Sequence, residues 1–238
     1  MKVLVTDELS QEGLDMLTKG SDIQVDVRPK LAHEELLKII GEYDALIVRS
    51  GTKVTAEVIE AGKRLRVIGR AGVGVDNVDV EAATRRGVLV MNTPAANIIS
   101  AAEHTMAMML TLARNIPRAD ASVKAGKWER SKFTGVELMG KTLGIVGIGR
   151  VGGEVAKRAK AFQMKLVGYD PYISQELAVK LGVRILPLEK VLEEADFITI
   201  HTPLTPTTHH LIGREQLALM KPSAFVVNCA RGGIIDED

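Results

Sequence analysis

The sequence predicts an α/β protein with two parallel sheets, one within residues 1–98 and the other within residues 99–238. Short apolar runs alternate with helical segments along the chain, a pattern typical of parallel strands joined by crossover helices. Glycine follows most of the helical segments, where it favours a helix end. A G-x-G-x-x-G motif joins a strand to a helix in the second half of the chain.

The first domain is predicted to be a flavodoxin-like parallel sheet with helices on both faces. Strands are expected at Lys2–Thr6, Ile23–Val27, Ala45–Arg49, Val67–Gly69 and Val88–Asn92. Helices are expected at Gln11–Lys19, Glu34–Ile40, Ala56–Ala61 and Val80–Arg86, ending before Gly20, Gly41, Gly62 and Gly87.

A long helix is expected to connect the two domains. Ser100 to Glu103 has the pattern of a capping box, so the helix should begin there and run to about Arg114, before Pro117. We interpret its apolar face as core rather than as a ligand site; that face carries Met106, Met109, Leu110 and Ala113. Residues 94–97 are interpreted as a hinge. Trp128, the only tryptophan, either packs on a domain edge or anchors a subunit interface.

The glycine motif lies between predicted strands and indicates a Rossmann-type dinucleotide site. Gly147 permits a tight turn, Gly149 lets a pyrophosphate approach the backbone, and Gly152 lets the helix pack against the strand. The N-terminus of the following helix, predicted over Glu154–Phe162, attracts phosphate.

Asp170 ends the next predicted strand, Lys165–Tyr169, where a carboxylate accepts hydrogen bonds from ribose hydroxyls. An acid there repels a 2′-phosphate, and residues 171–173 supply no basic side chain. We therefore expect NAD rather than NADP. The alternative is a structural turn followed by an ordinary aspartate.

Two later strands, Phe197–His201 and Ala224–Ala230, end in polar segments, and helices are expected before them at Gln175–Leu181 and Leu188–Glu194. Ligands bind beyond the carboxyl ends of parallel strands. The polar side chains expected to converge on the cofactor crevice are therefore His201, Thr202, Asn228 and Arg231.

Composition excludes several classes of function. The net charge is +1, from 31 basic and 30 acidic residues, which gives no electrostatic reason to expect nucleic acid or an anionic membrane. No apolar run approaches the roughly 20 residues of a membrane-spanning helix. The single cysteine, Cys229, permits no internal disulfide and suits the reducing cytoplasm.

Longer motifs resemble the D-isomer-specific 2-hydroxyacid dehydrogenase family over the whole chain. Besides the glycine motif, they are residues 48–55, 69–77, 91–94, 126–130, 169–171, 201–204 and 227–233. Where that family often has Asn-Gly-Asn after Thr-Pro, this chain has Ala95-Ala96-Asn97.

The resemblance implies NAD-linked hydride transfer, and in the branch most similar to this chain 3-phosphoglycerate is oxidised to 3-phosphohydroxypyruvate, the entry to serine synthesis. Arg231 matches the catalytic arginine, which holds the substrate carboxylate. Matches to NAD-contacting positions are Val73, Gly147, Gly149, Arg150, Val151, Gly152, Asp170, His201, Thr202, Pro203, Cys229, Ala230 and Arg231. Substrate-side matches are Arg49, Arg70, Gly72, Val73, Asn97 and, in a partner subunit's site, Arg130. A homo-oligomer, either dimer or tetramer, is therefore expected.

The family also uses a glutamate and a histidine that follow the arginine, and the sequence ends at Asp238 before either. Residues 234–238 resemble the acidic first turn of a further helix. We therefore expect a truncated NAD-binding domain that binds NAD weakly and lacks turnover.

The other histidines suggest no substitute site. His201 is interpreted as lining the cofactor rather than as a proton donor, and His104 as packed in its helix. His209 and His210, near an expected helix start, lack a third ligand, so no metal site is predicted. One alternative function is another D-2-hydroxyacid dehydrogenase, such as a glyoxylate or hydroxypyruvate reductase, against which Arg49, Arg70 and Arg130 argue. A non-catalytic NAD-binding regulatory protein also stays open.

Overall fold

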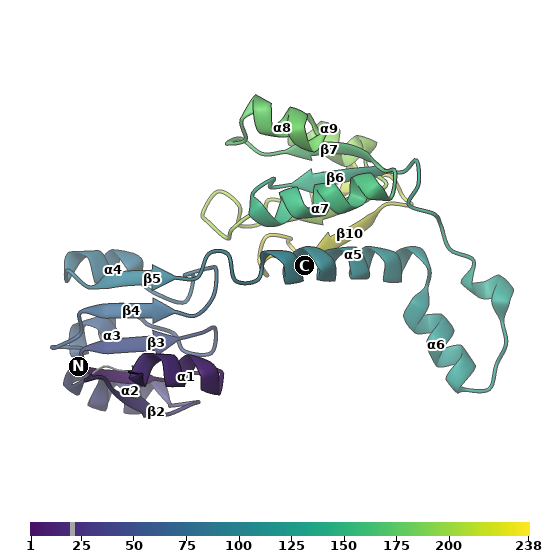
Figure 1. Ribbon diagram of the computed structural model, residues 1–238. Helices are drawn as coiled ribbons and strands as arrows, with labels where there is room; N and C mark the ends of the chain where they lie inside the picture. Colours follow the sequence, from purple (N-terminus) through teal and green to yellow (C-terminus); the bar gives the residue numbers. More distant parts are fainter. Residues whose placement is uncertain (20–21) are drawn as a thin grey trace. The chain divides into compact units, whose positions relative to one another are not determined.

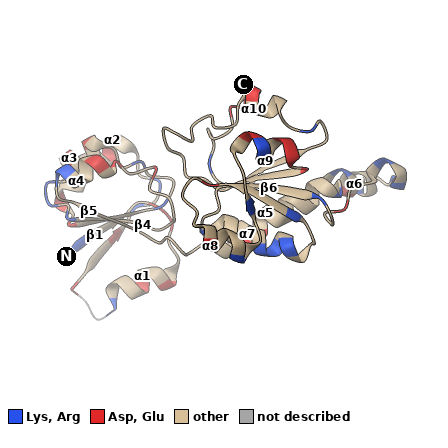
Figure 2. Ribbon diagram, turned by 90° about the horizontal axis from the view of Figure 1, so that it is seen from above, with Lys and Arg blue, Asp and Glu red and all other residues tan. Residues whose placement is uncertain are grey.

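The computed structural model describes residues 1–19 and 22–238, which form two compact units, Met1–Asn97 and Ile98–Asp238. Within these ranges each unit contains a five-stranded sheet with parallel pairing (Figure 1). Acidic and basic residues occur on the helices of both units (Figure 2). Among the described residues, no helix has the length and apolarity that a membrane crossing needs.

The first unit is a doubly wound sheet with the strand order β2-β1-β3-β4-β5. This is the flavodoxin-type order, so the predicted flavodoxin-like sheet is confirmed. Its strands are β1 (Lys2–Val5), β2 (Gln24–Val27), β3 (Ala45–Val48), β4 (Val67–Arg70) and β5 (Leu89–Asn92). Its helices are α1 (Gln11–Thr18), α2 (His33–Ile39), η1 (Ile40–Glu42), α3 (Ala56–Ala61) and α4 (Val80–Arg85).

Successive side chains of the central strands are buried on opposite faces of this sheet. Leu4 and Leu46 pack in one cluster with Leu36 of α2 and Ile59 of α3. Val3, Val5 and Ala45 pack on the opposite face, against Leu9 and Leu14. Strands buried on both faces are apolar without polar alternation, which explains why they could be found from the sequence.

The second unit has the strand order β10-β9-β6-β7-β8, the Rossmann arrangement over five strands in the described part of the chain. Its strands are β6 (Thr142–Val146), β7 (Lys165–Tyr169), β8 (Arg184–Ile185), β9 (Phe197–Ile200) and β10 (Phe225–Asn228). Its helices are α5 (Ile98–Ala113), α6 (Ile116–Lys124), η2 (Arg130–Phe133), α7 (Arg150–Ala161), α8 (Gln175–Leu181), α9 (Leu188–Glu194) and α10 (Arg214–Ala218).

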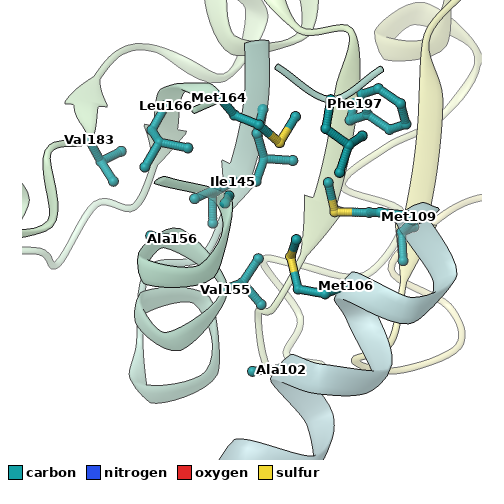
Figure 3. Packing of buried hydrophobic residues seen from close by; sticks show 14 of the residues in the cluster. Ala102, Met106, Met109, Ile145, Val155, Ala156, Met164, Leu166, Val183 and Phe197 are labelled. Carbon is teal, nitrogen blue, oxygen red and sulfur yellow. The ribbon is translucent and has the colours of Figure 1, made fainter. Parts of the chain in front are cut away.

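Helix α5 covers one face of the second sheet together with α7. Met106 and Met109 of α5 are buried beside Ile145 of β6 and Val155 of α7 (Figure 3). The interpretation of the methionine face as core is therefore confirmed. Its packing against α7, which starts at the glycine motif, makes α5 part of the scaffold of the second unit.

The structure corrects several expected helix boundaries. Helix α5 begins at Ile98, so Ser100 is its third residue and cannot be the N-cap. Its start follows directly from a turn in which the N–H of Ala96 donates to the carbonyl of Thr93. Pro117 does not merely end a helix: it lies in the first turn of α6, where proline is tolerated because no helical N–H is needed. The left-handed Asn115, with φ 53°, separates α5 from α6.

Other corrections concern glycine and the C-terminal segment. Gly41 does not stop a helix, because α2 passes directly into the 3-10 turn η1 that contains it. Helix α1 ends at Thr18, and its expected stop, Gly20, lies outside the described residues. The helix expected near His209 begins instead at Arg214. Residues 234–238 are not helical, because Ile235 forms a parallel bridge with Ile212.

Candidate functional site

One row of paired residues crosses the second sheet at its carboxyl edge. Val146 of β6 pairs with Tyr169 of β7 on one side and with Ile200 of β9 on the other, and Ile200 pairs with Asn228 of β10. The residues that follow these partners therefore begin neighbouring loops at one edge; they are Asp170, Gly147, His201 and Cys229. The strand order reverses between β6 and β9, which is where an open α/β sheet binds its ligand.

The glycine motif forms the turn between β6 and α7. Gly147 has φ 88°, and a Cβ there would lie 2.9 Å from the carbonyl carbon of His201. A Cβ at Gly152 would lie 2.2 Å from the carbonyl oxygen of Gly147, so only glycine lets the helix start so close to the strand. Gly149 is the N-cap of α7, and a Cβ there would meet no atom within 4 Å. The turn thus keeps open space beside the backbone where the sequence predicts a pyrophosphate.

Asp170 joins the glycine turn to the loop after β7. One carboxylate oxygen, Oδ2, accepts from the N–H of Ile148 at 2.7 Å, and Oδ1 accepts from the N–H of Tyr172 at 2.8 Å. These bonds fix the carboxylate at the edge of the turn. Arg150 is the first residue of α7, and Val151 beside it packs against the core.

The loop after β9 begins with a neutral histidine. The Nε2 atom of His201 lies 2.9 Å from Oγ1 of Thr199, and desolvation lowers the pKa of His201 to about 4. With this pKa the half-buried ring is uncharged at neutral pH and only weakly basic, which favours a lining role over proton transfer. The next hydroxyl, Oγ1 of Thr202, is buried and has no hydrogen-bond partner among the described residues. Pro203 follows, and its carbonyl accepts from Oγ1 of Thr208 at 2.6 Å.

Asn228 holds the loop that carries Arg231. Its Oδ1 accepts from the N–H of Ala230 at 3.0 Å, and its Nδ2 donates to the carbonyl of Arg231 at 2.8 Å. The Nη1 of Arg231 donates to the carbonyl of Ala230 at 2.8 Å. Cys229 lies partly buried against the core. The side chain of Asn228 therefore fixes the backbone of the loop from which Arg231 extends.

A dinucleotide fits this edge of the sheet. A bound pyrophosphate and its neighbouring groups would require three features that are present here: the left-handed backbone of Gly147, the free space at Gly149 and the unpartnered hydroxyl of Thr202. The predicted convergence of His201, Thr202, Asn228 and Arg231 is explained by the strand pairing, since each lies at or just beyond the carboxyl end of β9 or β10.

Four of the residues expected on the substrate side lie at the carboxyl edge of the first sheet. Arg49 directly follows β3, Arg70 ends β4, and Gly72 and Val73 lie in the loop after β4. The Nη1 of Arg70 lies over Gly72, where a Cβ would be only 1.6 Å away, and the buried Nε of Arg70 has no partner among the described residues. Nδ2 of Asn92 donates to the carbonyl of Val73 at 2.6 Å.

Arg49 lines a hollow of about 440 Å³ in the first unit. The other lining residues are Asp7, Glu8, Pro29, Lys30, Ser50 and Gly51. Asn97 is exposed and directly precedes α5.

Arg130 is not brought to the carboxyl edge of its own sheet. It begins η2, on the arm formed by α6 and η2, which projects from the second sheet (Figure 1). The chain returns from that arm into the amino end of β6, opposite to the glycine turn. Within the described ranges, no group of three or more His, Cys, Asp or Glu side chains is placed to hold a metal ion.

Sequence reasoning missed the residues that hold these loops. Asp7, Asn77 and Asn92 were not singled out as site residues, yet their side chains bind loop backbone in the first unit. Asn77 and Asn92 lie inside motifs that were quoted, so short polar side chains next to strand ends were the available signal.

Comparison with known proteins agrees with the geometry. Residues 106–238 match the family model described as D-isomer specific 2-hydroxyacid dehydrogenase, NAD binding domain. The chain belongs to this family. A dehydrogenase of this kind uses its Rossmann unit for NAD, which is the unit that carries the glycine turn and Asp170.

Individual relatives are similar over the whole chain. A D-3-phosphoglycerate dehydrogenase of Methanocaldococcus jannaschii is 56% identical over 238 residues, which are 100% of this chain and 45% of that protein. The TT0316 protein of Thermus thermophilus has a TM-score of 0.91 at 40% identity, covering 99% of this chain and 76% of that one. A D-lactate dehydrogenase from Aquifex aeolicus, complexed with NAD and lactic acid, has a TM-score of 0.86 at 32% identity, covering 99% and 71%. The chain thus spans less than half the length of the M. jannaschii relative.

Proposed function

We propose that the protein containing this chain is a NAD-dependent dehydrogenase that oxidises 3-phosphoglycerate to 3-phosphohydroxypyruvate. The observation that carries the proposal is the fixed Arg231 loop at the same edge of the sheet as the dinucleotide turn, in a chain 56% identical to a D-3-phosphoglycerate dehydrogenase. Bound NAD supplies the hydride acceptor. The reaction is the first step of L-serine biosynthesis, and the lone, partly buried Cys229 supports a cytoplasmic location.

The residues of the second unit position the reactants. The turn at Gly147, Gly149 and Gly152 holds the pyrophosphate and Asp170 binds the ribose, while the hydroxyl of Thr202 gains a partner in the cofactor. Arg231 binds the substrate carboxylate and stabilises charge at the oxo group. Because burial lowers the pKa of His201 to about 4, this histidine is a weak base, and its ring already contacts Thr199; we therefore assign proton transfer to the histidine and glutamate that the family carries beyond Arg231.

The first unit is proposed to be the substrate domain. Arg49, Arg70 and Asn97 would hold the phosphorylated end of the substrate, and backbone at Gly72 and Val73 would line its path. Clustered arginines suit a phosphate dianion better than the small uncharged end of glyoxylate. The position of Arg130 on the projecting arm supports a contact in a partner subunit's site, and therefore a homo-oligomer, dimer or tetramer.

Steady-state formation of NADH by the full-length protein tests this function. We expect turnover with 3-phosphoglycerate and NAD, and much lower kcat/KM with glycerate, which lacks the phosphate. Faster reduction of glyoxylate or hydroxypyruvate would favour the reductase alternative. Tight NAD binding without turnover of any 2-hydroxy acid would favour the regulatory alternative.

A further inference from the structure

Two side chains from separate parts of the first unit hold the loop that begins with Arg49. Oδ2 of Asp7 accepts from the N–H of Arg49 at 2.7 Å and from the N–H of Thr52 at 3.2 Å. Nδ2 of Asn77 donates to the carbonyl of Arg49 at 2.7 Å and to the carbonyl of Thr52 at 2.6 Å. Both backbone polar groups of the first and last residues of this loop are thus bound by the same pair of side chains, which we name the Asp7–Asn77 clamp.

The surroundings leave this clamp little freedom. A Cβ on Gly51 would lie 2.3 Å from Oδ1 of Asp7, so the loop passes this carboxylate closely only because residue 51 is glycine. On the other side, the carbonyl of Asn77 accepts from the N–H of Val54 at 2.8 Å, next to a bridge between Val54 and Val78. The clamp therefore connects the end of β1 to the segment before α4.

The clamp determines where the Arg49 side chain starts. Its backbone N–H and carbonyl are both fixed, and its Nη1 donates to the carbonyl of Glu8 at 3.3 Å. The side chain is thus held at both ends along the hollow that it lines with Lys30 and Ser50. An arginine binds a phosphate or carboxylate in a fork only when its plane has the right direction, so a shift of this loop would reduce the binding.

We propose that Asn77 and Asp7 are positioning residues that orient Arg49 toward an anionic group of the substrate. The inference rests on the proposed function, in which Arg49 is a substrate-side residue. Asn77 and Asp7 act through the backbone of residues 49–52, and Asp7 also lines the hollow beside Arg49.

Steady-state kinetics of full-length variants test the proposal. Asn77→Asp keeps the size of the side chain but directs a carboxylate oxygen at two carbonyl oxygens, which opens the clamp. We expect the KM for 3-phosphoglycerate to rise about tenfold, with kcat and the KM for NAD within about twofold, because such misplacement weakens a charged contact. Asp7→Leu should give the same result. Asp7→Asn, which retains an oxygen for both N–H groups, should stay within about threefold of the unsubstituted protein.

A nearby stability variant separates positioning from general destabilisation. Asp79 caps α4 by accepting from the N–H of Ala82 at 2.8 Å, two residues after Asn77. Asp79→Ala should lower Tm and leave the KM for 3-phosphoglycerate unchanged. An unchanged KM in Asn77→Asp, or an equal rise in Asp79→Ala, would overturn the proposal.

Amide hydrogen exchange tests the clamp even if the proposed substrate is wrong. Exchange at Arg49 and Thr52 should be slow in the unsubstituted protein and in Asp79→Ala, and at least about tenfold faster in Asp7→Leu. Lack of turnover of 3-phosphoglycerate by the unsubstituted protein would refute the proposed function alone. Equal exchange at these amides in Asp7→Leu and the unsubstituted protein would refute the clamp.

Discussion

Alanine substitutions at three glycines of the α7 start should separate stability from cofactor binding. At Gly152 a Cβ would lie 2.2 Å from the carbonyl oxygen of Gly147, whereas ordinary contacts begin near 3.4 Å. Helix and turn must therefore move apart by about 1 Å, which is overpacking that costs about 1–3 kcal/mol. For a chain of this size we expect Tm to fall by roughly 3–10 °C. A displacement of that size at the phosphate turn should also weaken NAD binding by about tenfold or more.

The neighbouring glycines provide matched controls. Gly149→Ala adds a Cβ that meets nothing within 4 Å, so Tm should change little, but the methyl group enters the space that a pyrophosphate needs and NAD affinity should fall at least about tenfold. Gly153→Ala places its Cβ 3.6 Å from Cδ1 of Leu181, an ordinary contact, inside a helix where alanine is favoured by about 1 kcal/mol. That variant should keep NAD affinity and gain stability.

Differential scanning calorimetry and calorimetric titration with NAD measure the two effects. The reasoning is refuted if Gly152→Ala has the same Tm and the same NAD affinity as the unsubstituted protein, or if Gly149→Ala binds NAD with unchanged affinity.

Three further outcomes are expected. Asp170→Ala should narrow the preference for NAD over NADP, measured as the ratio of the two dissociation constants; equal affinities in the unsubstituted protein would contradict the role of Asp170. Burial lowers the pKa of His201 from 6.5 to about 4. As the pH falls, the unfolded chain therefore binds a proton at this histidine before the folded chain does. His201 should therefore reduce stability between pH 6.5 and about 4, and His201→Gln should flatten that part of the stability curve in urea titrations. The exposed Trp128 segment is expected to form a dimer interface, so Trp128→Ala should shift light-scattering mass toward the monomer; a monomeric unsubstituted protein at micromolar concentration would contradict this.

Much of the fold could be predicted because its signals are local. Helices α3, α8 and α9 have the predicted bounds, and Gly182 ends α8 in the left-handed conformation, with φ 71°. Strand β8 was not predicted, because its two residues, Arg184–Ile185, are too few to form an apolar run. Helix α6 was missed because Pro117 was interpreted as the end of the preceding helix, whereas it lies in the first turn of α6.

The candidate site was predictable to the extent that it follows strand ends. The glycine turn, Asp170 and Arg231 each have a local motif, and strand order places them at one edge. The clamp on Arg49 could not be derived, because Asp7 and Asn77 are remote from it in sequence and meet it only after β1 and β3 pair. The predicted capping box at Ser100 is wrong because the helix already begins at Ile98, two residues earlier.

The strand order of the second sheet also sets a sequence of events during synthesis. The ribosome makes β6, β7 and β8 before β9 and β10, yet β9 pairs with the open side of β6. Until Phe197–Ile200 has been made, that side of β6 has unpaired backbone groups and uncovered apolar side chains, a combination that promotes aggregation. A pause in translation between β8 and β9 would prolong this exposure. Rare codons in that interval should therefore reduce the yield of folded protein more than the same codons placed after β10.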